Sequence, residues 1–348
     1  MSTVNNGPQI VRNGLVLNLD ASSVTSYSAI SVYKVECYST FGGGLRSANY
    51  TVQYSDDNST WTTAFTGVMS NNSSCGIIAG TNRNDSNYSK HRYWRYVEGG
   101  AVVGHHPRVS RIDFITKSGA VYNLVTYTTD NCADSGTYIV GTVSKDFGTT
   151  TWRDISGNAI NFTTFNTPVF NNANYGSLTF NGSSTYATAP ENSLFNTDAL
   201  TIECWARTSS INQNGFFFEK GTVNSQYAIF IEGTQIKIRT NTVISGIADL
   251  QFTAASYIQA NVWFLVTASY NNGLKRFYIN GVLLGTQTVT GGFTINASGM
   301  SIGAYGGFSG AKAYYYSGDI ANVKFYNRVL TDAEVSQNYE ATRKKFGL

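Results

Sequence analysis

Charged residues are scarce in this sequence, and so are cysteine, proline and histidine. Of its 348 residues, 13% are Asp, Glu, Lys or Arg, and there are 4 cysteines, 4 prolines and 3 histidines. The net charge of +3 is too small to indicate a nucleic-acid partner. No run of about 18 apolar residues occurs, so no membrane-spanning helix is expected. The opening residues MSTVNNGPQIV also lack the charged and apolar regions of a secretory signal.

The four cysteines lie far apart, at Cys37, Cys75, Cys132 and Cys204. No Cys-x-x-Cys pair is present and histidine is rare, which argues against a structural zinc site. We expect free, mostly buried thiols in a protein that is made and assembled in a cytoplasm, because reducing compartments disfavour disulfides. A Cys37–Cys132 or Cys75–Cys132 bridge remains the alternative.

Glycine and aromatic residues are abundant, with 34 Gly, 23 Tyr and 20 Phe. Short apolar or alternating segments are separated by Asn-Gly and other glycine-rich turns at spacings of about 8–12 residues, which is typical of a β-sandwich. The chain should therefore be almost entirely β. The expected strands are 14–20, 32–38, 50–54, 91–97, 109–115, 121–128, 176–180, 186–189, 200–207, 215–220, 227–232, 235–239, 263–270, 274–279 and 282–288.

A last strand is expected within residues 317–330, where apolar residues lie among polar neighbours in the pattern of a half-buried strand. A strand so late in a β-rich chain must pair with one already formed. We predict that its partner is the strand at 14–20, so that the two ends of the chain close one sandwich. After it, Thr331 and Glu334 have the spacing of a capping box, which predicts a short C-terminal helix.

Several segments, taken in order, resemble the concanavalin A-like jelly roll of the laminin-G-like family. They are GLVLNLDAS, TTWRDISGNA, GSLTFNGSSTYA, LTIECWAR, FLVTASYNNGLKRFYINGVLLGT, MSIGAY and YSGDIANVKFYNRVLTDAEV. The closing segment, from NRVLTDAEV to KFGL, is similar to copies of this domain in virion proteins of tailed phages. The resemblance implies a jelly-roll scaffold.

Between the first two of these segments, NYTVQYSDDNSTWTT and HRYWRYV resemble the discoidin (coagulation factor 5/8 type C) family of galactose-binding-like sandwiches. The two resemblances imply an all-β protein in which residues 1–28 and 146–348 form the jelly roll. Residues 29–145 would be a second β-sandwich, inserted at a surface turn where chain ends lie close together.

The sequence offers no clear catalytic set. Jelly-roll glucanases use two nearby carboxylates on one strand. The jelly-roll segment of this sequence has no such pair, because no carboxylate lies two residues from Glu191, Glu203, Glu219 or Glu232. No Gly-x-Ser-x-Gly nucleophile turn is present. His91, His105 and His106 could form a catalytic or metal cluster, but the favoured interpretation is a polar loop. We therefore expect a protein that is not an enzyme.

Calcium is the ion that the sequence suggests. Asp154, Ser156 and Asn158 alternate in a tight loop and offer oxygen ligands, and Asp20 or Asp319 would lie near them in the closed sandwich. The laminin-G-like resemblance also implies Ca²⁺ at a sandwich rim. The alternative is that Asp154 is an Asx-turn residue that binds the backbone of its own loop.

Aromatic side chains form the candidate carbohydrate site, since Tyr and Trp present flat apolar faces with a polar edge. Three consecutive tyrosines, Tyr314, Tyr315 and Tyr316, cannot all face one core, so at least one must be exposed or lie at an interface. Tyr88 and Trp94 raise the same question in the inserted segment. The alternative for all five is core packing or subunit contact.

These observations predict a non-enzymatic structural protein of a phage virion, assembled in the host cytoplasm, that decorates the capsid or tail or forms a fibre. Its expected partners are other virion proteins, host surface glycans and further copies of itself, with no nucleic acid and no cofactor other than Ca²⁺. Two alternatives remain: a free lectin or carbohydrate-binding module, and a glycan depolymerase.

Overall fold

The structure is a computed structural model of the whole chain. It describes residues 8–23, 32–39, 49–55, 60–68, 76–82, 91, 93–98, 111–117, 119, 121–126, 142–146, 150–171, 176–222, 224–271, 273–295 and 297–348.

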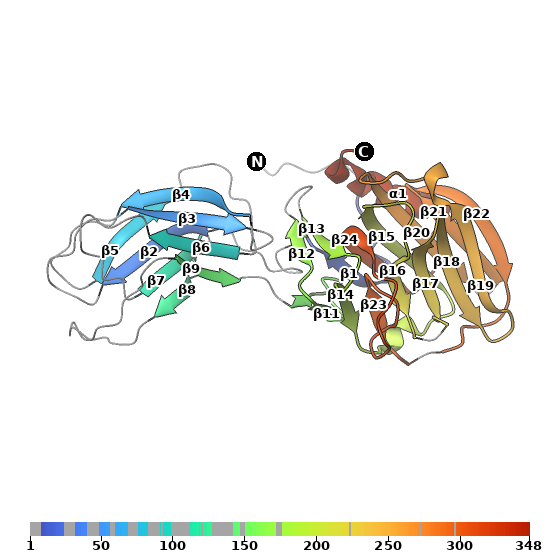
Figure 1. The fold of residues 1–348 in the computed structure, drawn as a ribbon. Coiled ribbons are helices and arrows are strands. Elements are labelled where there is room, and N and C mark those ends of the chain that lie inside the picture. Colours follow the sequence, from blue (N-terminus) through green and yellow to red (C-terminus); the bar gives the residue numbers. More distant parts are fainter. Residues whose placement is uncertain are drawn as a thin grey trace. The chain divides into compact units, whose positions relative to one another are not determined.

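The chain divides into two compact units, Met1–Tyr27 with Thr150–Leu348, and Ser28–Thr149. In its described part, each unit consists of two β-sheets, and the α-helix α1 (Asp332–Thr342) follows the last strand (Figure 1). The predicted all-β fold class with a short C-terminal helix is confirmed. Among the described residues, no helix is long and apolar enough to cross a lipid bilayer.

The first sheet of the first unit has β24 near its middle. Its strands are β1 (Leu15–Asp20), β12 (Val169–Asn171), β13 (Ser177–Asn181), β15 (Leu200–Thr208), β20 (Trp263–Asn271), β21 (Gly273–Ile279), β22 (Val282–Val289) and β24 (Ser317–Tyr326). The turn from β21 to β22 is Asn280-Gly281, and both residues have positive φ, as a tight hairpin of this type requires.

The second sheet of this unit runs in the order β10-β11-β14-β23-β16-β17-β18-β19. Its strands are β10 (Thr151–Trp152), β11 (Phe162–Phe165), β14 (Tyr186–Ala189), β16 (Gly215–Lys220), β17 (Tyr227–Glu232), β18 (Gln235–Thr242), β19 (Gly246–Thr253) and β23 (Met300–Ile302). Three short 3₁₀ helices complete the described part of the unit: η2 (Ser193–Phe195), η3 (Ala254–Ser256) and η4 (Arg343–Phe346).

The predicted pairing of the two ends of the chain is confirmed. β1 lies antiparallel to the second half of β24, with Leu17 opposite Phe325 and Asp20 opposite Asn322. The first half of β24 pairs on the same edge with β13, and its other edge pairs with β15 throughout. The prediction that this strand is half-buried was wrong, because nine of its ten residues are buried.

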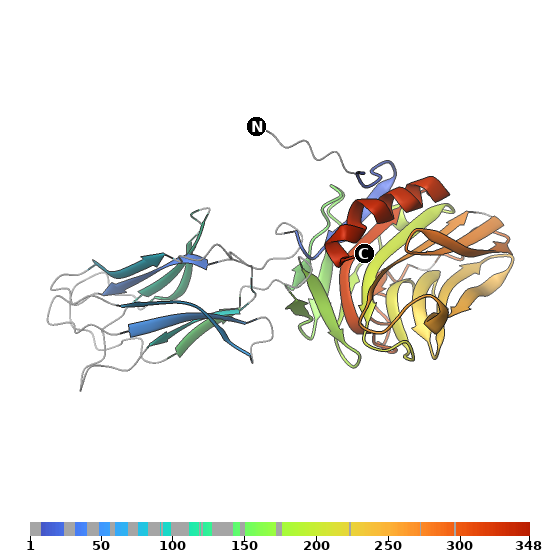
Figure 2. The same ribbon diagram turned by 90° about the horizontal axis from the view of Figure 1, so that it is seen from above.

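The C-terminal tail explains why β24 is buried on both faces. Phe346 of η4 stacks on Trp205 of β15, with ring centroids 4.1 Å apart, and also packs against Trp263 and Ala321. Figure 2 shows α1 lying across the strands of this sheet. The helix begins with the predicted capping box, in which Thr331 and Glu334 bind each other's backbone N–H groups.

Asn338 of α1 ties the helix to the sheet and to the N-terminal segment. Its Oδ1 accepts a hydrogen bond from the backbone N–H of Val11 (2.7 Å). Its Nδ2 lies 3.0 Å from both carboxylate oxygens of Glu203 and from the hydroxyl of Tyr326. Glu203 is fully buried, and desolvation raises its pKa, against the opposing effects of Lys324 and Asn338.

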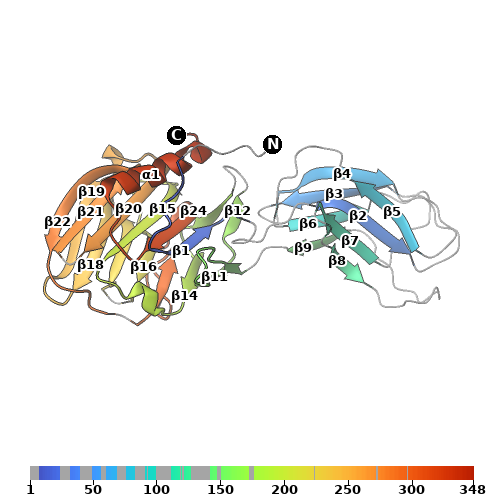
Figure 3. The same cartoon turned by 180° about the vertical axis from the view of Figure 1, so that it is seen from behind.

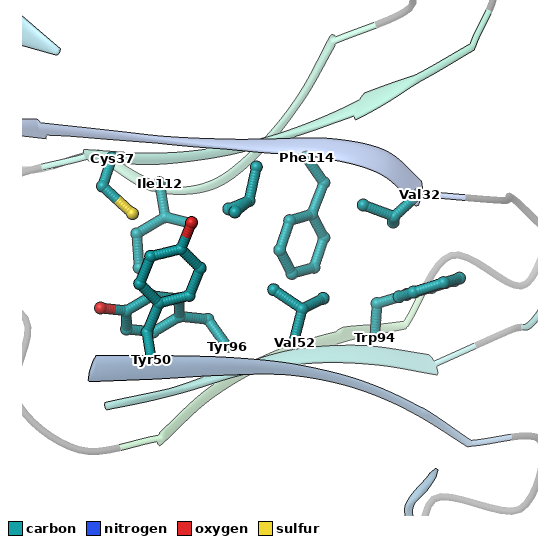
Figure 4. Packing of buried hydrophobic residues seen from close by; sticks show 9 residues of the cluster. Val32, Cys37, Tyr50, Val52, Trp94, Tyr96, Ile112 and Phe114 are labelled. Atoms are coloured by element: carbon teal, nitrogen blue, oxygen red, sulfur yellow. The ribbon is translucent and has the colours of Figure 1, made fainter. Parts of the chain in front are cut away.

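The second unit is a sandwich of two four-stranded sheets, β5-β2-β7-β8 and β4-β3-β6-β9. Their strands are β2 (Val32–Ser39), β3 (Asn49–Ser55), β4 (Thr62–Val68), β5 (Gly76–Asn82), β6 (Tyr93–Glu98), β7 (Arg111–Thr116), β8 (Val121–Thr126) and β9 (Thr142–Asp146). Side chains from β2 and β7 meet those of β3 and β6 in one apolar core (Figure 4).

Two segments of the second unit that are distant in the sequence lie side by side. β3 pairs with β6, so Tyr54 is opposite Trp94. Just beyond β3, the ring of Trp61 lies 4.1 Å from the guanidinium carbon of Arg95, a cation–π contact. The two motifs quoted for the discoidin resemblance therefore contact each other, while the membership of that family stays a prediction.

We predict that Asn338→Ala lowers the free energy of unfolding by about 2–4 kcal/mol, because it leaves the buried Glu203 carboxylate and the Val11 N–H without their partner. Chemical denaturation measures the change. The matched control is Gln337→Ala, whose side chain is exposed and binds the carbonyl of Gln9. A control that loses as much stability as Asn338→Ala would contradict the account.

Candidate functional site

The outer face of the second sheet of the first unit carries a pocket of about 270 Å³. Strands β16, β17 and β18 provide its floor, and residues 303–316, between β23 and β24, provide a wall (Figure 3 shows these strands from behind). It is lined by Asn214, Phe216, Phe230, Ile231, Glu232, Arg239, Tyr305 and Tyr314.

Aromatic rings form the walls of this pocket. Phe216 and Phe230 are stacked, with ring centroids 4.6 Å apart and planes 4° apart. Tyr305 lies 5.3 Å from Phe216 and 5.9 Å from Tyr314. Tyr314 is 51% exposed and has a φ of 48°, so a left-handed backbone conformation presents its ring to solvent at the pocket. Flat apolar faces with hydroxyl edges are therefore available to a ligand.

The rim of the pocket supplies hydrogen-bonding groups. Asn214 accepts from the N–H of Gly233 through Oδ1, which leaves its Nδ2 without a partner among the described residues. The Nε and Nη2 atoms of Arg239 bind Asp249, while no described residue accepts from its Nη1. Glu232 binds Lys237 through Oε2. Donors and one carboxylate thus surround the rings.

The three consecutive tyrosines have three different environments. Tyr314 lines the pocket. Tyr315 lies 6.3 Å from Tyr186 in a partly exposed group that also includes Phe165. Tyr316 is fully buried, 4.8 Å from Phe217 in the core, so it has no surface to offer a ligand.

Of the two aromatic candidates in the second unit, the structure describes Trp94. Trp94 is fully buried in the core of its own unit, where its Nε1 donates to the carbonyl of His91. A side chain without exposed surface cannot contact a sugar from solvent, and Trp94 contributes packing instead. His91 is also buried, stacked 3.6 Å from Tyr54. Tyr88 lies outside the described residues, as do His105 and His106.

The wall of the pocket is held from inside by a buried carboxylate. Glu219 of β16 accepts hydrogen bonds from the N–H groups of Gly306 (2.6 Å) and Gly307 (2.9 Å) and from the hydroxyl of Ser225. Lys312 donates to the carbonyls of Gly306, Gly307 and Gly310. Burial raises the pKa of Glu219 to about 7, although its hydrogen bonds act in the opposite direction.

Asp154 uses its carboxylate to organise its own loop. Oδ1 accepts from the N–H groups of Asn18 (3.0 Å) and Ser156 (2.8 Å), and Oδ2 accepts from Ser156 Oγ and the N–H of Ile160. Asn158 donates from its side chain to the carbonyl of Val16. These bonds have the form of the Asx-turn alternative.

The two further aspartates of the predicted calcium set each have a cationic partner. Asp20 accepts from Lys345 (3.3 Å) and from Ser22, and Asp319 forms an ion pair with Arg207 (2.6 Å). Among the described residues, no three His, Cys, Asp or Glu side chains are grouped so as to hold a metal ion. Backbone and hydroxyl oxygens lie outside that search, and calcium binding stays a prediction.

Two of the four cysteines can be placed. Cys37 and Cys204 are free, buried thiols, and burial raises the pKa of Cys37 to about 12. Such a thiol is inert at neutral pH. Cys75 and Cys132 lie outside the described residues.

Residues 181–336 match the model of the concanavalin A-like lectin/glucanases superfamily. Every residue that lines the pocket falls inside this laminin-G-type match. No curated protein matches the chain.

Solved structures similar to the chain include binding domains of botulinum neurotoxins. For the receptor-binding domain of type G, the TM-score is 0.43 with 18% identity over 54% of this chain and 47% of that chain. For the binding domain of botulinum neurotoxin DC in complex with rat synaptotagmin II, the TM-score is 0.45 with 18% identity over 55% of this chain and 48% of that chain. The chain thus spans about half the length of the solved structures that it matches.

The sequence analysis identified Tyr314 but missed the other residues of the pocket. The alternation in QIKIRT, with Ile236 and Ile238 buried, indicates that Lys237 and Arg239 point to the outer face. The run Phe216-Phe217-Phe218 raises the same question as the three tyrosines, since three rings in sequence do not all face one core. Both patterns are visible in the sequence, but only the tertiary fold shows that these residues line the same pocket as Tyr314.

We predict that Glu219→Gln changes how stability depends on pH. The pKa of Glu219 in the folded state is above its ordinary value of 4.5, so its contribution to stability is complete below pH 4.5 and is lost as the pH rises to about 7. The unfolding free energy of the wild type should therefore fall relative to that of Glu219→Gln, by up to about 3 kcal/mol across this window. Denaturation curves at several pH values test this, and parallel profiles would contradict it.

Proposed function

We propose that this chain binds carbohydrate through the aromatic pocket and catalyses no reaction on it. The observation that carries the proposal is the group of partly exposed tyrosine rings at the pocket, next to polar atoms that have no partner among the described residues. Tyr305 and Tyr314 offer apolar faces to a pyranose ring above the buried pair Phe216 and Phe230. Among the described residues, Asn214 Nδ2 and Arg239 Nη1 have no acceptor and can donate to its hydroxyl groups.

The carboxylates of the pocket favour binding over hydrolysis. Glycosidases flank the scissile bond with two carboxyl groups, one of which acts as an acid. Of the described residues that line this cavity, only Glu232 has a carboxylate, and it is bound to Lys237 at 2.6 Å. Glu219 lies behind the wall and is fully buried. A glycan depolymerase is therefore the weaker alternative.

The family match supports a carbohydrate ligand, because that superfamily includes lectins as well as glucanases and the match contains the whole pocket. It does not distinguish a binding protein from an enzyme. The single carboxylate among the described lining residues supports the binding protein.

We further propose that the chain is a virion protein of a tailed phage, assembled in the host cytoplasm, which decorates the capsid or tail or forms a fibre and attaches to host surface glycans. The support is the similarity of residues 327–348 to closing segments of phage virion proteins. The second unit would be an inserted discoidin-like module, and the protein would form homo-oligomers and contact other virion proteins. A free lectin or carbohydrate-binding module is the alternative.

A glycan array with the purified chain tests the pocket. We predict saturable binding that falls at least about 10-fold in Tyr314→Ala, a loss of about 1.4 kcal/mol of binding energy. Because Tyr314 is half exposed, this variant should remain folded. The matched control is Tyr257→Ala, since Tyr257 is 42% exposed and does not line the pocket.

Binding that survives unchanged in Tyr314→Ala would place the carbohydrate site elsewhere and contradict the proposal. The bound glycan should also remain intact on long incubation with the protein. Release of new reducing ends would show that the protein is a depolymerase.

A further inference from the structure

The basic residue at the rim of the pocket is already neutralised. Arg239 of β18 is directly opposite Asp249 of β19 in the antiparallel register. Its Nε binds Oδ1 and its Nη2 binds Oδ2, both at 2.8 Å, which is the fork geometry that guanidinium groups form with carboxylates. A ligand carboxylate that approached this edge of the guanidinium would compete with Asp249 for both donors.

The second charged pair at the rim has the same effect. Lys237 binds Glu232 at 2.6 Å, and both Lys237 and Arg239 lie over the ring of Phe230, at 6.0 and 5.0 Å. Two positive and two negative side chains thus share the rim, which carries no net charge. Glu232 lines the pocket and would repel an anion placed there.

Other lysines near the pocket do not alter this balance. Lys275 is fully buried on the inner side of the sheet, where its ammonium donates to the carbonyls of Ile238 and Ala248. Lys312 is bound to three carbonyls of the wall. Neither residue lines the cavity. The cationic residue among the described lining residues is Arg239, which is paired with Asp249, so an acidic sugar would have to compete for it.

We propose that the pocket selects neutral sugars over acidic ones, and that Asp249 sets this selectivity by occupying the guanidinium fork of Arg239. This inference rests on the proposed carbohydrate binding and adds the class of ligand. Asp249 does not line the cavity and acts through Arg239, so it is a positioning residue. Specificity of this kind comes from a repulsive arrangement against the wrong ligand as well as from contacts with the right one.

The test uses an array of matched neutral and acidic glycans, such as lactose with sialyllactose and glucosides with the corresponding glucuronides. The wild type should bind the neutral member of each recognised pair more tightly. In Asp249→Asn, the ratio of acidic to neutral affinity should rise at least 10-fold, because the charge of Arg239 is no longer balanced and the amide can accept from only one of its two donors. The ratio is measured within one preparation, so it does not depend on the fraction of protein that is folded.

Two further variants complete the experiment. Glu232→Gln also removes a negative charge from the rim and should shift the ratio in the same direction, even if Asp249→Asn does not fold. Glu340→Gln removes an exposed negative charge from α1, far along the chain, and should leave the ratio unchanged.

The outcomes separate the two proposals. A wild type that prefers acidic sugars in a Tyr314-dependent manner would overturn the inference and leave the carbohydrate site standing. An unchanged ratio in both rim variants would overturn the role of the paired charges. An array without any Tyr314-dependent binding would overturn the proposed function itself.

Discussion

Strand β24 is the element on which the first unit depends. Residues from both ends of the chain pair with it or cover it, and it continues directly from the wall of the pocket at residue 316. Its second residue must be glycine, because at the φ of 147° a Cβ atom of Gly318 would lie 2.3 Å from the carbonyl oxygen of Arg207. Close strand packing and burial on both faces therefore fix where the wall of the pocket begins.

The wall of the pocket is held in place by the strands on either side of it. It is anchored by β23 at one end and β24 at the other, and Glu219 binds the backbone of Gly306 and Gly307 in its first half. A site whose rings and rim charges are fixed in advance loses little conformational entropy when a ligand binds. The same arrangement explains why one tyrosine of three lines the pocket: the backbone conformation of Tyr314 turns its ring outward, while Tyr316 is directed into the core.

Local patterns predicted most of the fold. Strands with strong apolar faces, such as β16 and β17, were found within one or two residues, and so was the exposed edge strand β22, which the Asn280-Gly281 turn marks. The terminal pairing and the helix cap were also found. Other edge strands were missed, among them β4 and β19, because exposed edge residues have weak alternation. Asp249, the partner of Arg239, lies on β19, which was not predicted as a strand. The pairing of charges at the pocket therefore could not be predicted from the sequence. The burial of Trp94 depends on the sheet that covers β6, and the half-exposure of Tyr314 depends on the conformation of the segment between β23 and β24. The neighbouring sequence does not encode either.

Hydrogen–deuterium exchange of the full chain, with and without a neutral glycan that it binds, tests the central claim most directly. The account predicts that the glycan slows exchange in residues 227–239 and 303–316, which form the floor and wall of the pocket, and leaves residues 28–149 unchanged. Protection confined to residues 28–149, with the pocket segments unaffected, would contradict it.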